Sequence, residues 1–349
     1  MELTEIDRTA PALVELGRRA GHGNLLGVQP WLTPADYASA RALYVRLERL
    51  LAVAARAGRA GPRTIVVLPE YVGTWLVVAG APAAVLRARS VGRAMPLLIA
   101  HNAPAFLRAL AASHGPGRLR QALFRMRAPA MARTFHTVCS VLARNYGVTL
   151  VAGSILLPEP HVAQGELRAG SGPLRNVAAV YHPSGAADQR LARKVYPVAE
   201  ERGLVAAGDL TDLPVYETPA GRLGIAVCAD SWYPQVYEAL RARGAELIAV
   251  PSYLSGSQVW RKPWRGYNGA ALPPDVSPED VGHIAECEAW RKYALAGRAG
   301  PAGFRAGINV FLRGALWDLG ADGVSLGVRG AEGAAAPERD GAALINVWL

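Results

Sequence analysis

Several short runs of this sequence are apolar at nearly every position, whereas a strand on a protein surface would alternate apolar and polar residues. The clearest are RTIVVLPE (63–70), LGIAVCAD (223–230) and AELIAVPS (245–252). A strand has this continuous pattern when both of its faces are covered, as in α/β proteins whose sheets lie between other layers. Because segments with helical spacing separate these runs, the sequence predicts an α/β fold.

The same pattern continues along most of the chain, and it predicts a single domain over residues 1–349. We expect helices at 34–58, where Thr33–Pro34 provides a cap and first-turn pair, and at 130–145, 234–243 and 282–298. Two sections do not show this alternation of strands and helices. Residues 72–130 predict several helices, interrupted at HGPG (114–117), and residues 253–281 predict a long ordered loop. Further strands are expected at 24–31, 146–156, 175–183, 307–314 and 341–349.

Composition excludes several classes of protein. The formal charge is +10, but arginine is spread along the chain without a nucleic-acid-binding signature, which favours a solvated basic surface and no nucleic-acid partner. The three cysteines form no CxxC pair, and the seven histidines show no HExxH spacing, so we expect no disulfide framework, metal or cofactor. At 349 residues the chain can bury a large core without such supports.

Targeting signals are also not evident. Residues 1–21 lack the apolar core of a signal peptide, and the most apolar stretch, at 94–112, is interrupted by His101, Asn102 and Arg108. These patterns predict a cytoplasmic protein with no membrane span.

Three residues able to carry chemistry follow predicted strands. Glu70 ends VVLPE, Lys194 lies in RKVYP, and Cys228 ends the run GRLGIAVC. Taken one at a time, they could be an exposed glutamate, a solvated lysine and a core thiol. Together they offer a base, a cation and a nucleophile, which is a complete set for acyl transfer through a thioester.

These motifs resemble those of the nitrilase superfamily of carbon–nitrogen hydrolases, whose Glu-Lys-Cys set occurs in this order at strand ends. The matching elements are VVLPE, RKVYP and CADSWYP, and the resemblance runs from about residue 24 to 330, including GALWDLGADGVS. It implies a four-layer α-β-β-α sandwich, without cofactor, that assembles as a homodimer or larger homo-oligomer.

The resemblance also assigns roles. Glu70 would be the base, Cys228 the nucleophile, and Lys194 with the backbone N–H of Ala229 would stabilise the oxyanion. A second glutamate is implied by KVYPVAEER and falls at Glu201, with Glu200 as the alternative. Asp230 is expected to brace the turn after the nucleophile. Aromatic residues that follow these elements or lie in the long loop are candidates for the substrate pocket: Tyr71, Trp232, Tyr253 and Trp260.

The expected function is cysteine-dependent hydrolysis of a linear amide or, as a close variant, a nitrile. Two alternatives stay open: acyl transfer to an amine, with residues 72–130 as a lid over the thioester, and a catalytically silent binding protein. Tryptophan and arginine near the expected cleft hint at an aromatic or anionic ligand. Trp232, where many amidases of the family carry arginine, and the long 72–130 section leave the substrate open.

Overall fold

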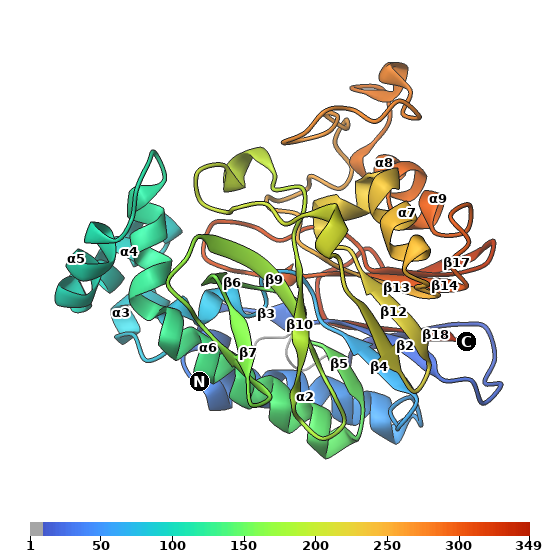
Figure 1. Cartoon of the computed structure of the whole chain (residues 1–349), viewed down its shortest axis with the longest axis horizontal. Helices are drawn as coiled ribbons and strands as arrows, with labels where there is room; N and C mark the ends of the chain where they lie inside the picture. The colour runs from blue at the N-terminus through green and yellow to red at the C-terminus, as the bar shows by residue number, and fades with distance from the viewer. Residues whose placement is uncertain (1–9) are drawn as a thin grey trace.

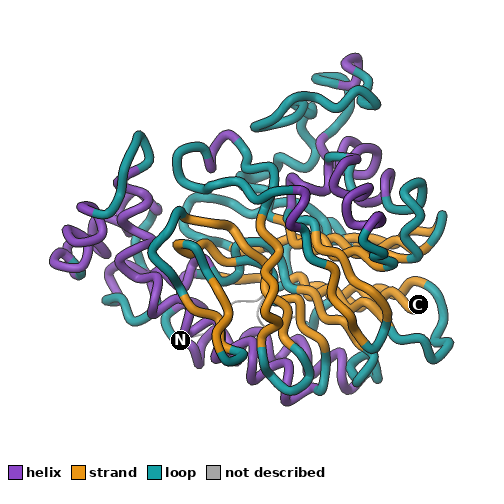
Figure 2. Tube along the Cα trace, in the orientation of Figure 1, coloured by secondary structure: helices purple, strands orange, loops and turns teal. Residues whose placement is uncertain are grey.

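Two stacked β-sheets form the centre of the molecule (Figures 1 and 2). The computed structural model describes residues 10–349; residues 1–9, which belong to the segment predicted to lack a signal peptide, lie outside the described residues. Within 10–349, the larger sheet has the strand order β1-β18-β2-β4-β5-β9-β10, with β6 paired to β9. Its strands are β1 (Ala12–Leu16), β2 (Asn24–Gln29), β4 (Thr64–Val67), β5 (Thr149–Val151), β6 (Ile155–Pro158), β9 (Leu174–Tyr181), β10 (Ala187–Arg193) and β18 (Ala343–Trp348).

The second sheet has the order β11-β12-β13-β14-β16-β17. Its strands are β11 (Val215–Thr218), β12 (Gly221–Ile225), β13 (Leu247–Ser252), β14 (Ala306–Phe311), β16 (Leu326–Arg329) and β17 (Glu332–Ala335). The central strands β12, β13 and β14 are parallel to one another, as are β2, β4 and β5 in the first sheet. Two short pairs lie outside these sheets: β3 (Trp31–Leu32) with β15 (Arg313–Gly314), and β7 (His161–Ala163) with β8 (Glu166–Arg168).

The sheets pack face to face, and the alternation of side chains along β4 shows how. Ile65 and Val67 belong to the core that also holds Ile308 of the second sheet, whereas Val66 points to the opposite core with the outer helices. At Gly27 a Cβ would come within 2.8 Å of Ile308 Cδ1, so a residue without a side chain lets the sheets approach. Both faces of β4 are therefore buried, which explains its continuous apolar sequence.

Helices complete a four-layer α-β-β-α sandwich, as expected from the sequence. In Figure 1, α2 (Ala40–Arg56) and α6 (Arg118–Tyr146) lie along one side, and α7 (Pro234–Ala242), α8 (Glu286–Tyr293) and α9 (Leu295–Arg298) along the other. Leu43, Leu47 and Leu51 form the apolar stripe that α2 packs against the first sheet. On the opposite side, Gly224 of β12 lies against Leu240 of α7.

Some element boundaries differ from the prediction. The helix expected at 34–58 is divided into η1 (Pro34–Tyr37) and α2, because Ser39 is extended and its side chain caps α2 by accepting from Ala42 N–H. Helix α6 continues through Pro129, so the predicted boundary at residue 130 falls inside one helix. Strands such as β1 and β11 were not predicted, because their burial is mixed and their sequences are less apolar.

The two sections that lack the alternation of strands and helices lie at the rim of the sandwich (Figure 1). Residues 72–130 contain η2 (Thr74–Val78), α3 (Ala83–Leu86), α4 (Val91–His101), α5 (Ala103–Ala111) and the beginning of α6. Residues 253–281 form a long loop with a single short helix, η6 (Pro278–Asp280), within the described chain. Over residues 10–349, no helix combines the length and the apolar character needed to cross a membrane.

Candidate active site

Glu70, Lys194 and Cys228 meet at one end of the sandwich, and each comes shortly after the end of a strand. Glu70 follows β4 and Cys228 follows β12, while β10, which precedes Lys194, is antiparallel to β9 and therefore runs parallel to β5 and β4. All three are buried, with exposures of 1%, 7% and 2% for Glu70, Cys228 and Lys194. The structure thus brings together the residues that the sequence placed at three separate strand ends.

A single buried ammonium group holds two carboxylates at the centre of the site. Lys194 Nζ lies 2.9 Å from Glu70 Oε1 and 2.8 Å from Glu201 Oε2. Of the two candidate second glutamates, Glu201 makes this contact; it lies in η3 (Ala199–Glu201) and also accepts from the backbone N–H of Val198. Glu200 points elsewhere and accepts from Asn268 at 2.8 Å.

Asn176 completes this network, and the sequence analysis did not identify it. Its Nδ2 donates to Glu70 Oε1 at 2.9 Å and to Glu201 Oε1 at 3.2 Å, so one amide links both carboxylates. Asn176 is 1% exposed and lies within β9, between Arg175 and Val177. A polar residue directly before the apolar run 177–181 was the available signal, because buried polar groups are retained only where they find partners.

Two sharp turns present the base and the nucleophile. Tyr71, directly after Glu70, and Cys228 both adopt left-handed backbone conformations, with φ of 60° and 52°. Such conformations cost about 1–3 kcal/mol for residues other than glycine and persist only where their surroundings fix them. Ser154 Oγ accepts from Tyr71 N–H at 2.9 Å, and the Tyr71 hydroxyl binds Glu201. The turn after β4 is therefore fixed on both sides.

Asp230 fixes the second turn. Its carboxylate accepts from the backbone N–H of Val227 at 3.1 Å, which braces the nucleophile turn as the sequence predicted. It also accepts from Val195 at 3.0 Å and Tyr196 at 2.7 Å, the residues that follow Lys194. Burial raises the pKa of Asp230 to about 7, although these donors favour the carboxylate. One side chain therefore sets the position of the cysteine relative to the lysine.

The electrostatics of the site favour a neutral thiol and raise the proton affinity of the base next to it. Burial raises the pKa of Cys228 well above its usual value, and the neighbouring Glu70 raises it further. Burial also raises the pKa of Glu70, against the opposing effect of Lys194. For Lys194, burial acts to lower the pKa, but Glu70 and Glu201 together hold it well above the ordinary range. Burial likewise opposes ionisation of Glu201, but Lys194 and its hydrogen bonds lower its pKa overall.

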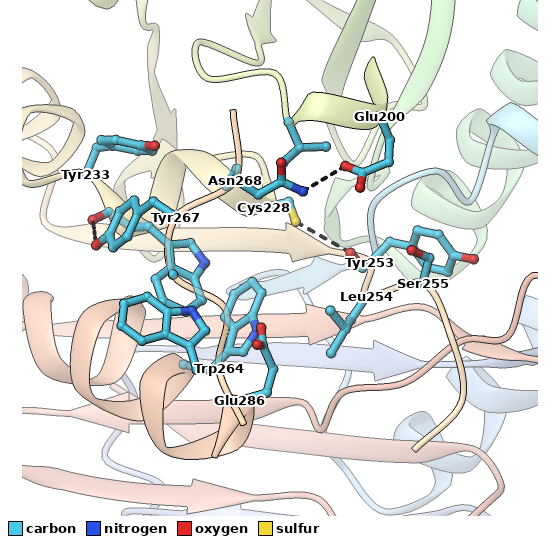
Figure 3. Close-up of a pocket in the computed structure, with 15 residues that line it drawn as sticks. Glu200, Cys228, Tyr233, Tyr253, Leu254, Ser255, Trp264, Tyr267, Asn268 and Glu286 are labelled. Atoms are coloured by element: carbon cyan, nitrogen blue, oxygen red, sulfur yellow. Dashed lines mark hydrogen bonds between the residues drawn. The ribbon is translucent and has the colours of Figure 1, made fainter. Parts of the chain in front are cut away.

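Cys228 opens onto a cavity of about 170 Å³ (Figure 3). Its thiol donates to the Tyr253 carbonyl oxygen at 3.6 Å. The cavity is built from the cysteine turn, the start of the 253–281 loop, residues 264–268 and α8. Its lining residues are Val198, Glu200, Cys228, Ala229, Trp232, Tyr233, Tyr253, Leu254, Ser255, Trp264, Gly266, Tyr267, Asn268, Glu286 and Trp290.

Of the four aromatic residues predicted to form the substrate pocket, two line this cavity and two do not. Trp232 and Tyr253 line it. Tyr71 lies behind Tyr253, with ring centroids 6.0 Å apart, and Trp260 packs edge-on against Phe311 at 5.5 Å, outside the lining. Sequence reasoning missed Tyr267, although it lies in the same long loop as Tyr253 and Trp260, and Glu286, because only the folded chain brings α8 beside the cysteine.

The sequence of this chain places it in a known enzyme family. A family model described as "Carbon-nitrogen hydrolase" matches residues 34–271, and the chain belongs to this family. Locally, it is 41% identical over 69 residues to Nitrilase 2 of Arabidopsis thaliana, a segment covering 20% of each protein. It is 29% identical over 121 residues to the N-carbamoylputrescine amidase of Solanum tuberosum, covering 31% of this chain and 40% of that protein.

Solved structures show the same fold. An amidase from Nesterenkonia sp. superposes with a TM-score of 0.56 at 18% identity, over 95% of this chain and 92% of that one. A mutant of that amidase, described with acrylamide added to its active-site cysteine, gives a TM-score of 0.58 at 17% identity, over 94% and 93% of the two chains. The nitrilase-superfamily sandwich expected from the sequence is thus confirmed at the level of the fold.

Proposed function

We propose that this protein hydrolyses a linear amide through a thioester on Cys228. The observation that carries the proposal is the buried Glu70–Lys194–Glu201 group directly behind a cysteine that opens onto a cavity. A base, a fixed cation and an accessible nucleophile are the parts that acyl transfer requires. Since a second glutamate stays paired to Lys194, the lysine remains an ammonium when Glu70 takes up a proton.

In the first half-reaction, Cys228 Sγ attacks the amide carbon while its proton passes to Glu70. The carbonyl electron pair moves onto oxygen, and the resulting oxyanion is stabilised by Lys194 Nζ and by the backbone N–H of Ala229. Ala229 lies in the first turn of η5 (Cys228–Trp232), where helical N–H groups have no acceptor within the helix. Each such donor is typically worth about 3–4 kcal/mol of transition-state stabilisation. The C–N bond then breaks, and Glu70 returns the proton to the departing amine or ammonia.

In the second half-reaction, water gives a proton to Glu70 and attacks the thioester carbonyl. The C–S bond breaks, the carboxylic acid is released, and the cysteine sulfur recovers its proton from Glu70. Glu201 and Asn176 act as positioning residues, because they contact Lys194 and Glu70 rather than the reacting atoms. The net reaction consumes one amide and one water and needs no further reactant.

A nitrile is the second candidate substrate, favoured by the local match to plant nitrilases. Attack of Cys228 on a nitrile carbon would form a thioimidate, which water converts to the same thioester with release of ammonia. We favour water over an amine as the acyl acceptor, because within the described chain no residue of 72–130 lines the cavity as a lid would. The expected homo-oligomer and cytoplasmic location stay predictions.

The test is ammonia release from a panel of aliphatic and aryl amides and the corresponding nitriles. Wild type should release ammonia from at least one of them, and Cys228→Ala should reduce the rate at least 1,000-fold. Cys139→Ala is the matched control, because Cys139 is buried in α6 away from the site. Undiminished turnover by Cys228→Ala would contradict the proposed mechanism.

A further inference from the structure

The cavity beyond Cys228 has an unusual charge for this protein. The whole chain carries a formal charge of +10. Among the described residues that line the cavity, however, the charged side chains are Glu200 and Glu286, with no lysine, arginine or histidine. The anionic ligand that the arginines of the sequence suggested is thus not supported at this cavity, because such a ligand would meet carboxylates there.

Of the two carboxylates, Glu286 is the better candidate to bind a ligand. Its Oε1 accepts from Trp290 Nε1 at 3.1 Å, and no ion pair with a described cation is found. Burial raises the pKa of Glu286 to about 7, opposed by the hydrogen bond from Trp290. Arg298 contacts the Tyr267 hydroxyl of this wall, but it is paired with Asp275 at 2.6 Å. Among the described residues, the Glu286 carboxyl group therefore has no cationic partner, and a cationic ligand would favour its ionised form.

Aromatic rings line the same cavity as this carboxylate. Trp232 stacks on Trp264 at 5.7 Å and meets Trp290 and Tyr267 edge-on at 4.8 and 5.4 Å. In Figure 3, Glu286 lies next to Trp264 on one side of Cys228, and Glu200 lies on the other side. Aromatic faces attract alkylammonium groups through their negative quadrupole, and they also desolvate the attached methylene chain. The rings pack on one another too tightly to form a slot, so they act as a wall.

We propose that this wall selects substrates whose end remote from the scissile bond is a protonated amine, held by Glu286 against Trp232, Trp264 and Trp290. The inference rests on the proposed function, since it places the reacting carbon at Cys228. Glu200, exposed at the cavity and tied to Asn268, adds negative potential along the route inward. The substrate class is thus an ω-amino amide or its nitrile, rather than an acidic one.

The experiment compares 5-aminopentanamide with hexanamide, in which a methyl group replaces the ammonium. Wild type should show a kcat/KM at least tenfold higher for the amine. Glu286→Gln keeps an acceptor for Trp290 but removes the charge, and the ratio should fall below three. Glu279→Gln, an exposed carboxylate in η6, is the matched control and should keep the wild-type ratio. A ratio near one in wild type, or a ratio unchanged in Glu286→Gln, would overturn the inference.

A second measurement separates this inference from the catalytic proposal. The inactive Cys228→Ala protein is titrated with the same two amides by calorimetry. Tighter binding of 5-aminopentanamide, lost in the Cys228→Ala/Glu286→Gln protein, supports the cation site even if no amide is hydrolysed. Equal binding of the two amides, or no binding of the amine, overturns the cation site whatever the outcome of the turnover assays.

Discussion

Replacing Lys194 with methionine tests the electrostatic centre of the site. Lys194 is buried and lies within 2.9 Å of both Glu70 and Glu201, so Lys194→Met leaves two buried carboxylates without their cation. Removing one partner of a buried ion pair typically costs about 3–5 kcal/mol. We therefore expect the free energy of unfolding to fall by about that amount at pH 8.

The loss should depend on pH, and its sign follows from the protons bound. Without Lys194, burial and mutual repulsion raise the folded-state pKa of the carboxylates above the unfolded value. The folded variant then binds protons that the unfolded chain releases, so stability is lost as pH rises and recovered as it falls. One such proton across three pH units is worth at most about 4 kcal/mol, and we expect about 2 kcal/mol to be recovered at pH 5.

Urea unfolding of wild type and variant at pH 5 and pH 8 measures this difference. Lys262→Met is the matched control, because Lys262 is exposed and should change stability by less than about 0.5 kcal/mol at either pH. If Lys194→Met lost the same amount at both pH values, the carboxylates would not be held by the lysine charge, and this description of the site would be wrong.

Three further substitutions test how the site is held. Asp230→Asn puts an amide donor against backbone N–H groups; we expect a loss of about 2–4 kcal/mol by urea unfolding, and an unchanged stability would contradict the bracing role. Gly153→Ala would place a Cβ against the Pro69 carbonyl oxygen at a φ of +69°, so we expect a lower melting temperature and weaker turnover; a wild-type melting temperature would show that this loop is adaptable. Asn176→Ala should lower kcat about tenfold while leaving KM within twofold, because it removes a donor to Glu70; rate assays showing an unchanged kcat would exclude a positioning role.

Much of the fold was predictable because the central strands are covered on both faces. Runs such as 64–67 and 247–252 are buried at every position, and their composition shows it directly. Edge strands such as β11 have mixed burial, so their pattern carries less information. The split at Ser39 and the uninterrupted α6 depend on local capping and packing, which hydrophobic spacing does not report.

Some residues of the site were likewise predictable from the sequence and others were not. Glu70 and Cys228 were predictable because each follows a predicted apolar strand and carries a reactive group. Lys194 was identified from the RKVYP motif, since the partly exposed strand β10 before it was not predicted. The preference for Glu201 over Glu200 depended on the motif alone, since adjacent carboxylates in a short helix differ only in where the fold points them. Glu286 could not be predicted, because it comes from α8 and becomes a site residue only when the 253–281 loop packs beside Cys228.

The most direct test of an activated Cys228 uses the other cysteines as internal controls. Cys228 and Cys287 have nearly equal exposures, 7% and 8%, but only Cys228 lies against Glu70 and opens onto the cavity. Iodoacetamide labelling of the folded protein, followed by peptide mass spectrometry across pH 5–9, should modify Cys228 first. Lys194→Met should slow that labelling at least tenfold, because the charge of Lys194 lowers the pKa of the Cys228 thiol and the thiolate is the reactive form. Equal rates for Cys228 and Cys287, or no effect of Lys194→Met, would contradict the claim that this site activates its cysteine.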